Sequence, residues 1–316
     1  MARAAAERSP VNIHRRHLWI RIWQAKYIYL MLLPLFIWLA VFCYRPMYGI
    51  IMAFKDYKAR LGILGSPWYG LKHFERIFTT PDAMRAIWNT VTISIGRLLF
   101  EFPMGILLAL MITEMPGRRL KRVYQTVYTF PHFLSWIIVA SIIMNFLSSN
   151  GAINLVLKRQ GLLPINFLAN QSIFRGLLYF TGNWKEMGWS AIIYMSAIAG
   201  IDPTLYEAAK IDGATRLKQI LHVTLPGIAT TICVMLILQV GNMMNAGFDQ
   251  VFNLYNDVVR PVADILDTYI YNITFLATPN YGFSTAVGLF KSVINFFILF
   301  AANFTVYRIT GQRMLL

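Results

Sequence analysis

Six long apolar stretches alternate with short polar segments along the chain. Each is close in length to the ~20 mostly apolar residues that a helix needs to cross the hydrocarbon core of a bilayer. The longest polar segment, residues 55–85, is too short for a separate soluble domain. The pattern predicts an all-α integral membrane protein with six transmembrane helices. Apart from a possible extension of the first to residue 54, they cover residues 27–44, 88–111, 123–147, 177–199, 226–248 and 285–307.

The composition supports a membrane protein rather than a soluble one. Hydrophobic residues make up 57% of the 316 residues, charged residues only 14%, and the mean hydropathy is +0.52. Ordinary soluble domains carry ~25% charged residues. A soluble fold of this length could not bury so much apolar surface, so we expect lipid to surround most of the chain.

The net charge of +15 bears on both partners and orientation. Such an excess fits a nucleic-acid surface, contact with anionic lipid, or basic cytoplasmic loops. The apolar composition favours the membrane interpretations, so we expect membrane lipid and no nucleic acid as partner. Lys and Arg are more frequent in the segments that are inside if both termini are cytoplasmic. The prediction is a basic cytoplasmic tail at 1–26 and a six-span domain at 27–316 with a cytoplasmic loop at 201–226.

That cytoplasmic loop contains a predicted short helix. Asp202 suits the N-cap and Pro203 the first helical position, while Gly213 can adopt positive φ and end the helix. One face of this helix has small side chains and could bind a partner protein. Alternatively, the helix could simply connect two spans at the membrane surface. The residues of that face follow at helical spacing: Leu205, Ala208, Ala209 and Asp212.

The same loop resembles a known motif. Residues 207–209 read Glu-Ala-Ala, Gly213 follows after three residues, and Leu-Pro occupies 225–226. This is similar to the EAA motif of the permease subunits of binding-protein-dependent type I ABC importers. The single departure is Val223, where the family pattern has Ile.

The resemblance extends from about residue 28 to the end of the chain. Segments 44–50, 70–74 and 131–136 are similar to importers of oligosaccharides and polysaccharides, and within that subgroup to alginate importer permeases. The resemblance implies the type I importer permease fold. It also implies a protein that crosses a bacterial inner membrane several times. The implied partners are a second homologous permease, two ATPase subunits, an extracytoplasmic solute-binding protein and a saccharide substrate.

The resemblance also assigns roles within the loop. The short helix would be the coupling helix, whose glutamate contacts the ATPase, whose alanines allow close docking and whose glycine forms the turn. ATP-driven closure of the ATPase pair would then move the spans by alternating access. The implied coupling residues are Glu207, Ala208, Ala209, Asp212 and Gly213.

The sequence contains no G-x-x-x-x-G-K-[ST] phosphate loop, and H-E-x-x-H and C-x-x-C are also absent. We therefore expect no enzyme activity, no metal site and no cofactor in this chain, with ATP and Mg bound by the partner ATPase. The alternative is an ion-coupled secondary transporter without an ATPase. Such transporters show inverted repeats and broken helices, which the sequence does not display.

Ionisable side chains within spans usually face the bundle interior or a wet cavity. Arg97 and Glu101 are four residues apart and can pair on one helix face, either structurally or along a substrate path. Lys185 and Glu186 near the outer start of the fourth span are adjacent and diverge by ~100°, so we do not expect them to share a face. Snorkelling to the interface is the alternative for Lys185 and for Lys291.

The fifth span carries a polar stripe at i, i+3 and i+7, formed by Asn242, Asn245 and Asp249. Such a stripe can bind sugar hydroxyls along a hydrated path, or bridge neighbouring helices. Trp184 could stack on a sugar ring or sit in an interfacial belt. The candidate substrate pathway comprises Arg97, Glu101, Trp184, Lys185, Asn242, Asn245, Asp249 and Lys291.

Overall fold

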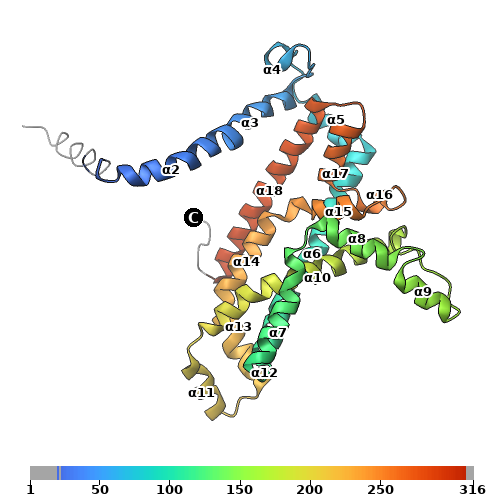
Figure 1. Ribbon diagram of the computed structural model, residues 1–316. Coiled ribbons are helices and arrows are strands. Elements are labelled where there is room, and N and C mark those ends of the chain that lie inside the picture. The colour runs from blue at the N-terminus through green and yellow to red at the C-terminus, as the bar shows by residue number, and fades with distance from the viewer. Residues whose placement is uncertain (1–19, 21–22, 311–316) are drawn as a thin grey trace, which may run out of the picture.

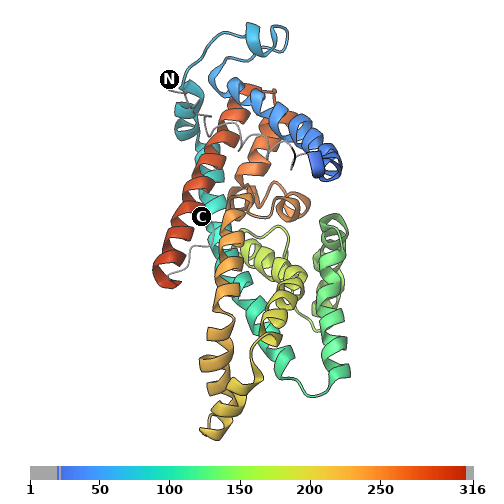
Figure 2. The same cartoon turned by 90° about the vertical axis from the view of Figure 1, so that its left-hand side faces the viewer.

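The computed structural model describes residue 20 and residues 23–310. Within these residues the chain is helical, and the only β pairing described is one isolated antiparallel bridge between Lys55 and Trp68. The molecule is elongated (Figures 1 and 2), and residues 55–85 lie at the opposite end from residues 201–226. The helices at these two ends are α4 (Gly62–Gly65), α5 (Lys72–Thr79), α11 (Pro203–Ile211) and α12 (Arg216–Gln219).

The first helical segment confirms the longer form of the first predicted span. It is one candidate span at Lys26–Phe54, and none of its most apolar 18-residue window is buried. It projects away from the body in Figure 1, and its end packs against the last helix of the chain. Its parts are α2 (Lys26–Trp38), η1 (Leu39–Tyr44), α3 (Arg45–Met47) and η2 (Tyr48–Phe54).

The centre of the body is a pair of long helices, α6 (Pro81–Glu114) and α10 (Gln171–Ala199). The helix α6 includes the second predicted span, and α10 includes the fourth. Small residues allow their close approach, since a Cβ built on Gly105 would lie 2.8 Å from the Cβ of Ser190. This is the way helices associate in lipid, where van der Waals packing replaces the hydrophobic effect.

The third predicted span, 123–147, is wrong as a single helix. Pro131 lacks a backbone donor, and Ser135 starts a new helix by accepting a hydrogen bond from the Ile138 N–H at 3.4 Å. The candidate span in this region therefore begins after the break, at Trp136–Arg159. The elements are α7 (Arg118–Thr129), η3 (Phe130–Phe133), α8 (Trp136–Leu147) and α9 (Ala152–Arg159).

The fifth predicted span, 226–248, is also wrong as a single helix. The helices Arg216–Gly227 and Ala229–Gly241 meet at a bend of 62°, and the helix stops at Gly241. The sixth prediction is confirmed by α18 (Tyr281–Thr310). The remaining elements are η4 (Ile220–Thr224), α13 (Leu225–Gly227), α14 (Ala229–Gly241), η5 (Met243–Asn245), α15 (Phe248–Leu254), α16 (Arg260–Ala263), α17 (Leu266–Tyr271) and η6 (Asn272–Leu276).

Four helices of the described residues are long and apolar enough to cross a membrane, or five if the bent pair is one span. The helix α10 does not meet that test, and it carries Arg175, Lys185 and Glu186. Its charges are bound inside the bundle instead. The Arg175 guanidinium, for example, donates to the Asn89 Oδ1 at 2.8 Å and to the Val262 carbonyl at 3.1 Å.

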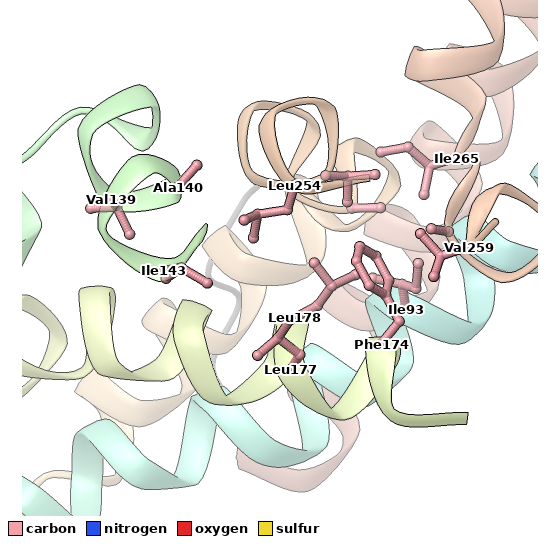
Figure 3. Packing of buried hydrophobic residues seen from close by; sticks show 13 residues of the cluster. Ile93, Val139, Ala140, Ile143, Phe174, Leu177, Leu178, Leu254, Val259 and Ile265 are labelled. Carbon is pink, nitrogen blue, oxygen red and sulfur yellow. The ribbon is translucent and has the colours of Figure 1, made fainter. Parts of the chain in front are cut away.

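The largest buried apolar cluster joins four segments of the chain. Figure 3 shows side chains from α6, α8 and α10 meeting those that follow α14. The cluster fixes α8, which is set across the body rather than along it, against the central pair (Figures 1 and 3). Its labelled members are Ile93, Val139, Ala140, Ile143, Phe174, Leu177, Leu178, Leu254, Val259 and Ile265.

Candidate functional site

The short helix predicted at the cytoplasmic loop forms as α11. The Asp202 carboxylate caps it, accepting the Thr204 N–H at 2.9 Å, and Pro203 occupies the first position. The same hydrogen bond holds the pKa of Asp202 below its ordinary value, because the bond favours the ionised form. Asp212 lies at the C-cap and Gly213 follows at φ +74°, so the predicted start, end and glycine turn are all confirmed.

No residue of α11 is buried. Glu207 and Ala208 are exposed and Ala209 is half-buried. Leu205 is 53% exposed and Ile211 87% exposed. Apolar side chains gathered on an exposed surface mark interaction sites more often than accident. The outer face of α11, defined here as Leu205, Ala208, Ile211 and Asp212, is therefore free to meet a partner.

The opposite face of α11 is tied to the body. The Tyr206 hydroxyl hydrogen-bonds to the Thr224 hydroxyl at 3.0 Å. Beyond the glycine turn, the exposed side chain of Arg216 forms an ion pair with Glu114 at the end of α6, at 3.6 Å. Surface ion pairs of this kind contribute ~0–1 kcal/mol. The segment is thus positioned by a few polar contacts rather than by a packed core.

A second group of polar residues lies between α6, α10 and α15. The predicted pair forms, with Arg97 Nη1 3.4 Å from Glu101 Oε1 one helical turn away. The Arg97 guanidinium also donates to the Oε1 of Gln250. The Gln250 amide in turn donates to the Leu178 carbonyl at 2.8 Å and to the Thr181 hydroxyl at 2.7 Å. We call Arg97, Glu101, Thr181 and Gln250 the polar cluster.

Glycines let this cluster form. A Cβ built on Gly182 would lie 2.5 Å from Glu101 Oε1, and one on Gly247 would overlap the Arg97 guanidinium. A side chain at either position would therefore force these charged groups to shift from the places they occupy. The ion pair is consequently enclosed, with the Arg97 and Glu101 side chains only 14% and 12% exposed.

The polar cluster borders a cavity of about 150 Å³ between α6 and α14. Two predicted pathway residues of α6 and one of the fifth predicted span, Asn242, therefore share one cavity. The Nε of Arg97 is buried and has no hydrogen-bond partner among the described residues. The lining residues are Ser94, Arg97, Leu98, Glu101, Gln239, Asn242, Met243, Ala246 and Gly247.

The predicted polar stripe is not continuous. The helix ends at Gly241, and Ala246 (φ +46°) and Gly247 (φ +73°) adopt left-handed backbone before α15 begins. Two successive left-handed residues interrupt a right-handed helix. Asn242, Asn245 and Asp249 consequently do not share a helix face, and only Asn242 lines the cavity.

Asn245 faces a different partner. Its Oδ1 accepts from the Lys291 ammonium at 2.9 Å, and Lys291 also contacts both carboxylate oxygens of Asp267 at 2.7 Å. Lys291 thus bridges α18 to α17 and to η5, rather than reaching toward an interface alone. Asp249 lies exposed on α15.

Lys185 is buried, with 5% of its surface exposed, in the middle of α10 rather than near an outer end. Its ammonium contacts the His132 carbonyl and Glu186 Oε1, both at 2.9 Å. Lys185 and Glu186 point to surroundings of different exposure, 6% and 38%, as expected of adjacent helix positions, yet the ends of their side chains meet. Lys185 holds the α7–α8 break against α10, whereas Trp184 is exposed on α10 and does not line the cavity.

The sequence reasoning missed Gln250. It is fully buried and connects α6, α10 and α15 through its amide. The signal available in the sequence was a polar amide, Gln250, shortly after the Ala246-Gly247 pair in an otherwise apolar region. Among the described residues, no group of three or more His, Cys, Asp or Glu side chains could hold a metal ion.

Comparisons with known proteins identify the family of the chain. The family described as "Binding-protein-dependent transport system inner membrane component" matches residues 101–311. The Polygalacturonan/rhamnogalacturonan transport system permease protein YteP of Bacillus subtilis (strain 168) is 45% identical over 290 residues, covering 92% of this chain and 90% of that protein. Protein LplB of the same organism is 41% identical, covering 88% of each.

A solved structure is also similar. One chain in the crystal structure of a bacterial ABC transporter involved in the import of the acidic polysaccharide alginate superposes with a TM-score of 0.86 at 40% identity. The match covers 93% of this chain and 99% of that chain. A second structure of the bacterial alginate ABC transporter, in complex with an alginate pentasaccharide-bound periplasmic protein, gives the same TM-score and identity. The chain belongs to the family of binding-protein-dependent transport system inner membrane components, and is a permease subunit of an ABC importer.

Proposed function

We propose that this chain moves fragments of an acidic polysaccharide, of which alginate is the leading example, from an extracytoplasmic binding protein into the cytoplasm. The observation that carries the proposal is the 40% identity and TM-score of 0.86 to a chain of the alginate importer over nearly the whole of both chains. The relative named for polygalacturonan and rhamnogalacturonan transport makes these plant polysaccharides the second candidate substrate.

The cavity beside the polar cluster is the proposed substrate contact. Its amides, Gln239 and Asn242, can hydrogen-bond sugar hydroxyls, and the positive charge of Arg97, which lines the cavity, can attract a carboxylate. A cavity of about 150 Å³ is smaller than the ~300–1,000 Å³ usual for ligand sites. We therefore propose that it is one wall of a path completed by a second homologous permease, with Asn245, Asp249, Trp184, Lys185 and Lys291 outside this wall.

The unburied first helix supports a second permease as partner. None of the most apolar window of Lys26–Phe54 packs on this chain. Lipid or another subunit must cover such a surface, and in the proposed assembly the second permease covers part of it. Two ATPase subunits and the binding protein complete the importer.

The coupling assignment rests on the exposure of α11, none of whose residues is buried. In the proposed complex Glu207 contacts the ATPase, Ala208 and Ala209 allow close docking, Asp212 faces cations of the ATPase, and Gly213 makes the turn. ATP and Mg bind to the ATPase subunits, which hydrolyse the ATP and drive alternating access. The ion-coupled alternative is not favoured, because the family depends on a binding protein.

We further propose six spans with both termini cytoplasmic in a bacterial inner membrane, a basic tail at 1–26 and a permease domain at 27–316. The helix α10 has 29 residues and is about 43 Å long at 1.5 Å per residue, enough to cross the ~30 Å hydrocarbon core. The bent pair ending at Gly241 is the fifth span. The candidate span Trp136–Arg159 is the proposed third span, and α7 precedes it.

Orientation can be tested by labelling single cysteines with a membrane-impermeant maleimide. In a background lacking Cys43 and Cys233, Lys72→Cys should react from outside intact cells, and Lys218→Cys only after permeabilisation. The reverse pattern would invert the proposed topology.

The assembly can be tested by purifying the tagged chain from native membranes in mild detergent, with mass spectrometry of the bound proteins. Recovery of an ATPase and a second permease is expected. A chain that purifies alone and transports without ATP would overturn the proposal.

A further inference from the structure

A polar cavity separate from the proposed substrate path lies beside residues 201–226, which we call the coupling segment. It has a volume of about 400 Å³ and lies where the ends of α6 and α10 meet α7, α11 and α12. Cavities of this size are large enough for small ligands. The outer face of α11 points away from it, whereas Tyr206 and Lys210 line it.

Cationic groups reach this cavity from three separate helices: Lys121 on α7, Lys210 on α11 and Arg216 on α12. Among the described lining residues, Glu114 is the single carboxylate, and it pairs with Arg216 at 3.6 Å. The Lys121 ammonium contacts the Thr113 carbonyl. No partner of the Lys210 ammonium is seen within the described residues. The lining therefore carries an excess of positive charge that one carboxylate does not neutralise.

One further donor in the cavity, the Gln125 amide, is weakly used. The Gln125 amide donates to the thioether sulfur of Met195 at 3.5 Å, and sulfur is a weak acceptor. The lining also contains the apolar residues Leu110, Ile112 and Ile198. Donors and cations together with apolar residues suit an anion attached to an apolar or carbon-rich body.

We propose that this cavity binds a phosphate group, held between Lys121, Lys210 and Arg216. Phosphate oxygens can accept from several donors at once, so one group can bridge cations on three helices. The inference goes beyond the proposed function, although it assumes the proposed cytoplasmic location of α11. Two sources share the required chemistry: the headgroup of an anionic phospholipid of the inner leaflet, and a soluble phosphate ester.

Such a ligand has a mechanical consequence. Within the described residues, the coupling segment is tied to the end of α6 by the exposed pair of Arg216 and Glu114. A phosphate bridging Lys121 to Lys210 would add a second connection, which would join the coupling segment to α7. Its occupancy would therefore stiffen the coupling segment relative to the membrane helices.

The test measures binding on the purified importer with all its subunits, in phosphatidylcholine nanodiscs with or without phosphatidylglycerol. Native mass spectrometry counts the phosphatidylglycerol retained. Glycerol 3-phosphate, titrated by calorimetry into the phosphatidylcholine sample, probes the soluble source. The variants are Lys121→Gln and Lys210→Gln, with Lys210→Arg to restore the charge.

The matched control is Lys218→Gln, since Lys218 lies exposed on α12 but does not line the cavity. We expect binding of one of the two probes to weaken about fivefold for each lysine removed, the effect of losing one cation near an anionic headgroup. Lys210→Arg and Lys218→Gln should bind as the wild type does. Retention of phosphatidylglycerol alone identifies a lipid site, and binding of glycerol 3-phosphate identifies a soluble ligand.

The proposal is overturned if neither probe binds, if binding is indifferent to Lys121 and Lys210, or if Lys218→Gln weakens it equally. A matching melting temperature in all variants ensures that misfolding is not the cause of weaker binding. Because the assay uses no saccharide, binding protein or ATP, it can fail while the proposed transport function stands, and the reverse.

Discussion

The polar cluster and the coupling segment are held in place by opposite means. Arg97 and Glu101 are enclosed by three helices and by glycines at 182 and 247, and the buried amide of Gln250 fixes them. Glu207 lies on a short helix with no buried residue, positioned by its cap and its glycine turn. A buried polar group depends on partners far away in the sequence, whereas an exposed docking helix depends on its neighbours.

The sharpest way to break this comparison is to reverse the charge at the exposed helix. Glu207→Lys should reduce uptake by at least about 30-fold without affecting membrane insertion, because losing a docked charge pair costs roughly 2–5 kcal/mol. Uptake into cells and copurification of the ATPase are the measurements.

Glu75→Lys is the matched control for Glu207→Lys, since Glu75 is exposed on α5 at the other end of the molecule. It should leave the ATPase bound. Full uptake with normal ATPase stimulation in Glu207→Lys would remove the coupling assignment.

The buried side of the comparison is tested by Gln250→Leu. The substitution removes the hydrogen bonds that Gln250 makes to the Arg97 guanidinium, the Leu178 carbonyl and the Thr181 hydroxyl in an enclosed site. A net hydrogen bond is worth roughly 0.5–1.5 kcal/mol. Thermal unfolding in detergent should show a clear decrease in melting temperature. Gln171→Leu, which removes one exposed hydrogen bond to Val258, should change it little. Equal melting temperatures for the two variants would contradict the role given to Gln250.

Alanine substitutions of the polar residues at 242, 245 and 249 distinguish a residue of the substrate path from residues with a structural role. Asn242→Ala should reduce uptake about 2- to 10-fold, the effect of one lost hydrogen bond, while the ATPase still copurifies. Asp249→Ala should have a smaller effect, because Asp249 lies outside the cavity. Asn245→Ala should act through Lys291, with a lowered melting temperature. Loss of ATPase assembly in Asn242→Ala would favour a purely structural role.

The glycine turn of the coupling segment has a smaller expected effect. Gly213→Ala forces a Cβ into a left-handed conformation at φ +74°, which costs roughly 1–2 kcal/mol. We expect ATP hydrolysis to respond less to substrate, while the melting temperature stays near that of the wild type. Gly176→Ala, at a helical glycine with open space around it, is the control. Unchanged coupling in Gly213→Ala would show that the turn is not needed.

The cap of α11 has the smallest expected effect. Asp202→Ala should speed amide hydrogen exchange at Thr204 by removing its acceptor. Because the folded-state pKa of Asp202 is lowered from 3.8, the cap stabilises α11 above that value and is lost as pH falls through the lowered pKa. The difference between wild type and variant should therefore disappear in strong acid. A difference that persists there would contradict the cap.

The difference between local and distant contacts explains which features could be predicted from the sequence. The start, end and turn of α11 follow from Asp202, Pro203 and Gly213, because capping is a local interaction. The Arg97–Glu101 pair follows from one helical turn. Hydropathy also located the spans at Lys26–Phe54 and Tyr281–Arg308.

Other features depend on contacts between distant segments. The breaks near Pro131 and at 242–247 lie within apolar runs, where hydropathy does not distinguish one helix from two. The Lys291–Asp267 bridge, the enclosure of Lys185 and the position of Gln250 arise only when α10, α17 and α18 pack. Polar residues in such runs could be recognised as important, but their partners could not be assigned.

The most direct test of the central claim is uptake of a labelled alginate oligosaccharide into proteoliposomes that contain the purified importer, its binding protein and ATP at the ATPase side. The account predicts uptake that requires ATP and the binding protein and that is lost in Glu207→Lys. Uptake of an equally long neutral oligosaccharide should be weaker. Uptake driven by an ion gradient without ATP would contradict the account, as would ATP-driven uptake that proceeds normally in Glu207→Lys.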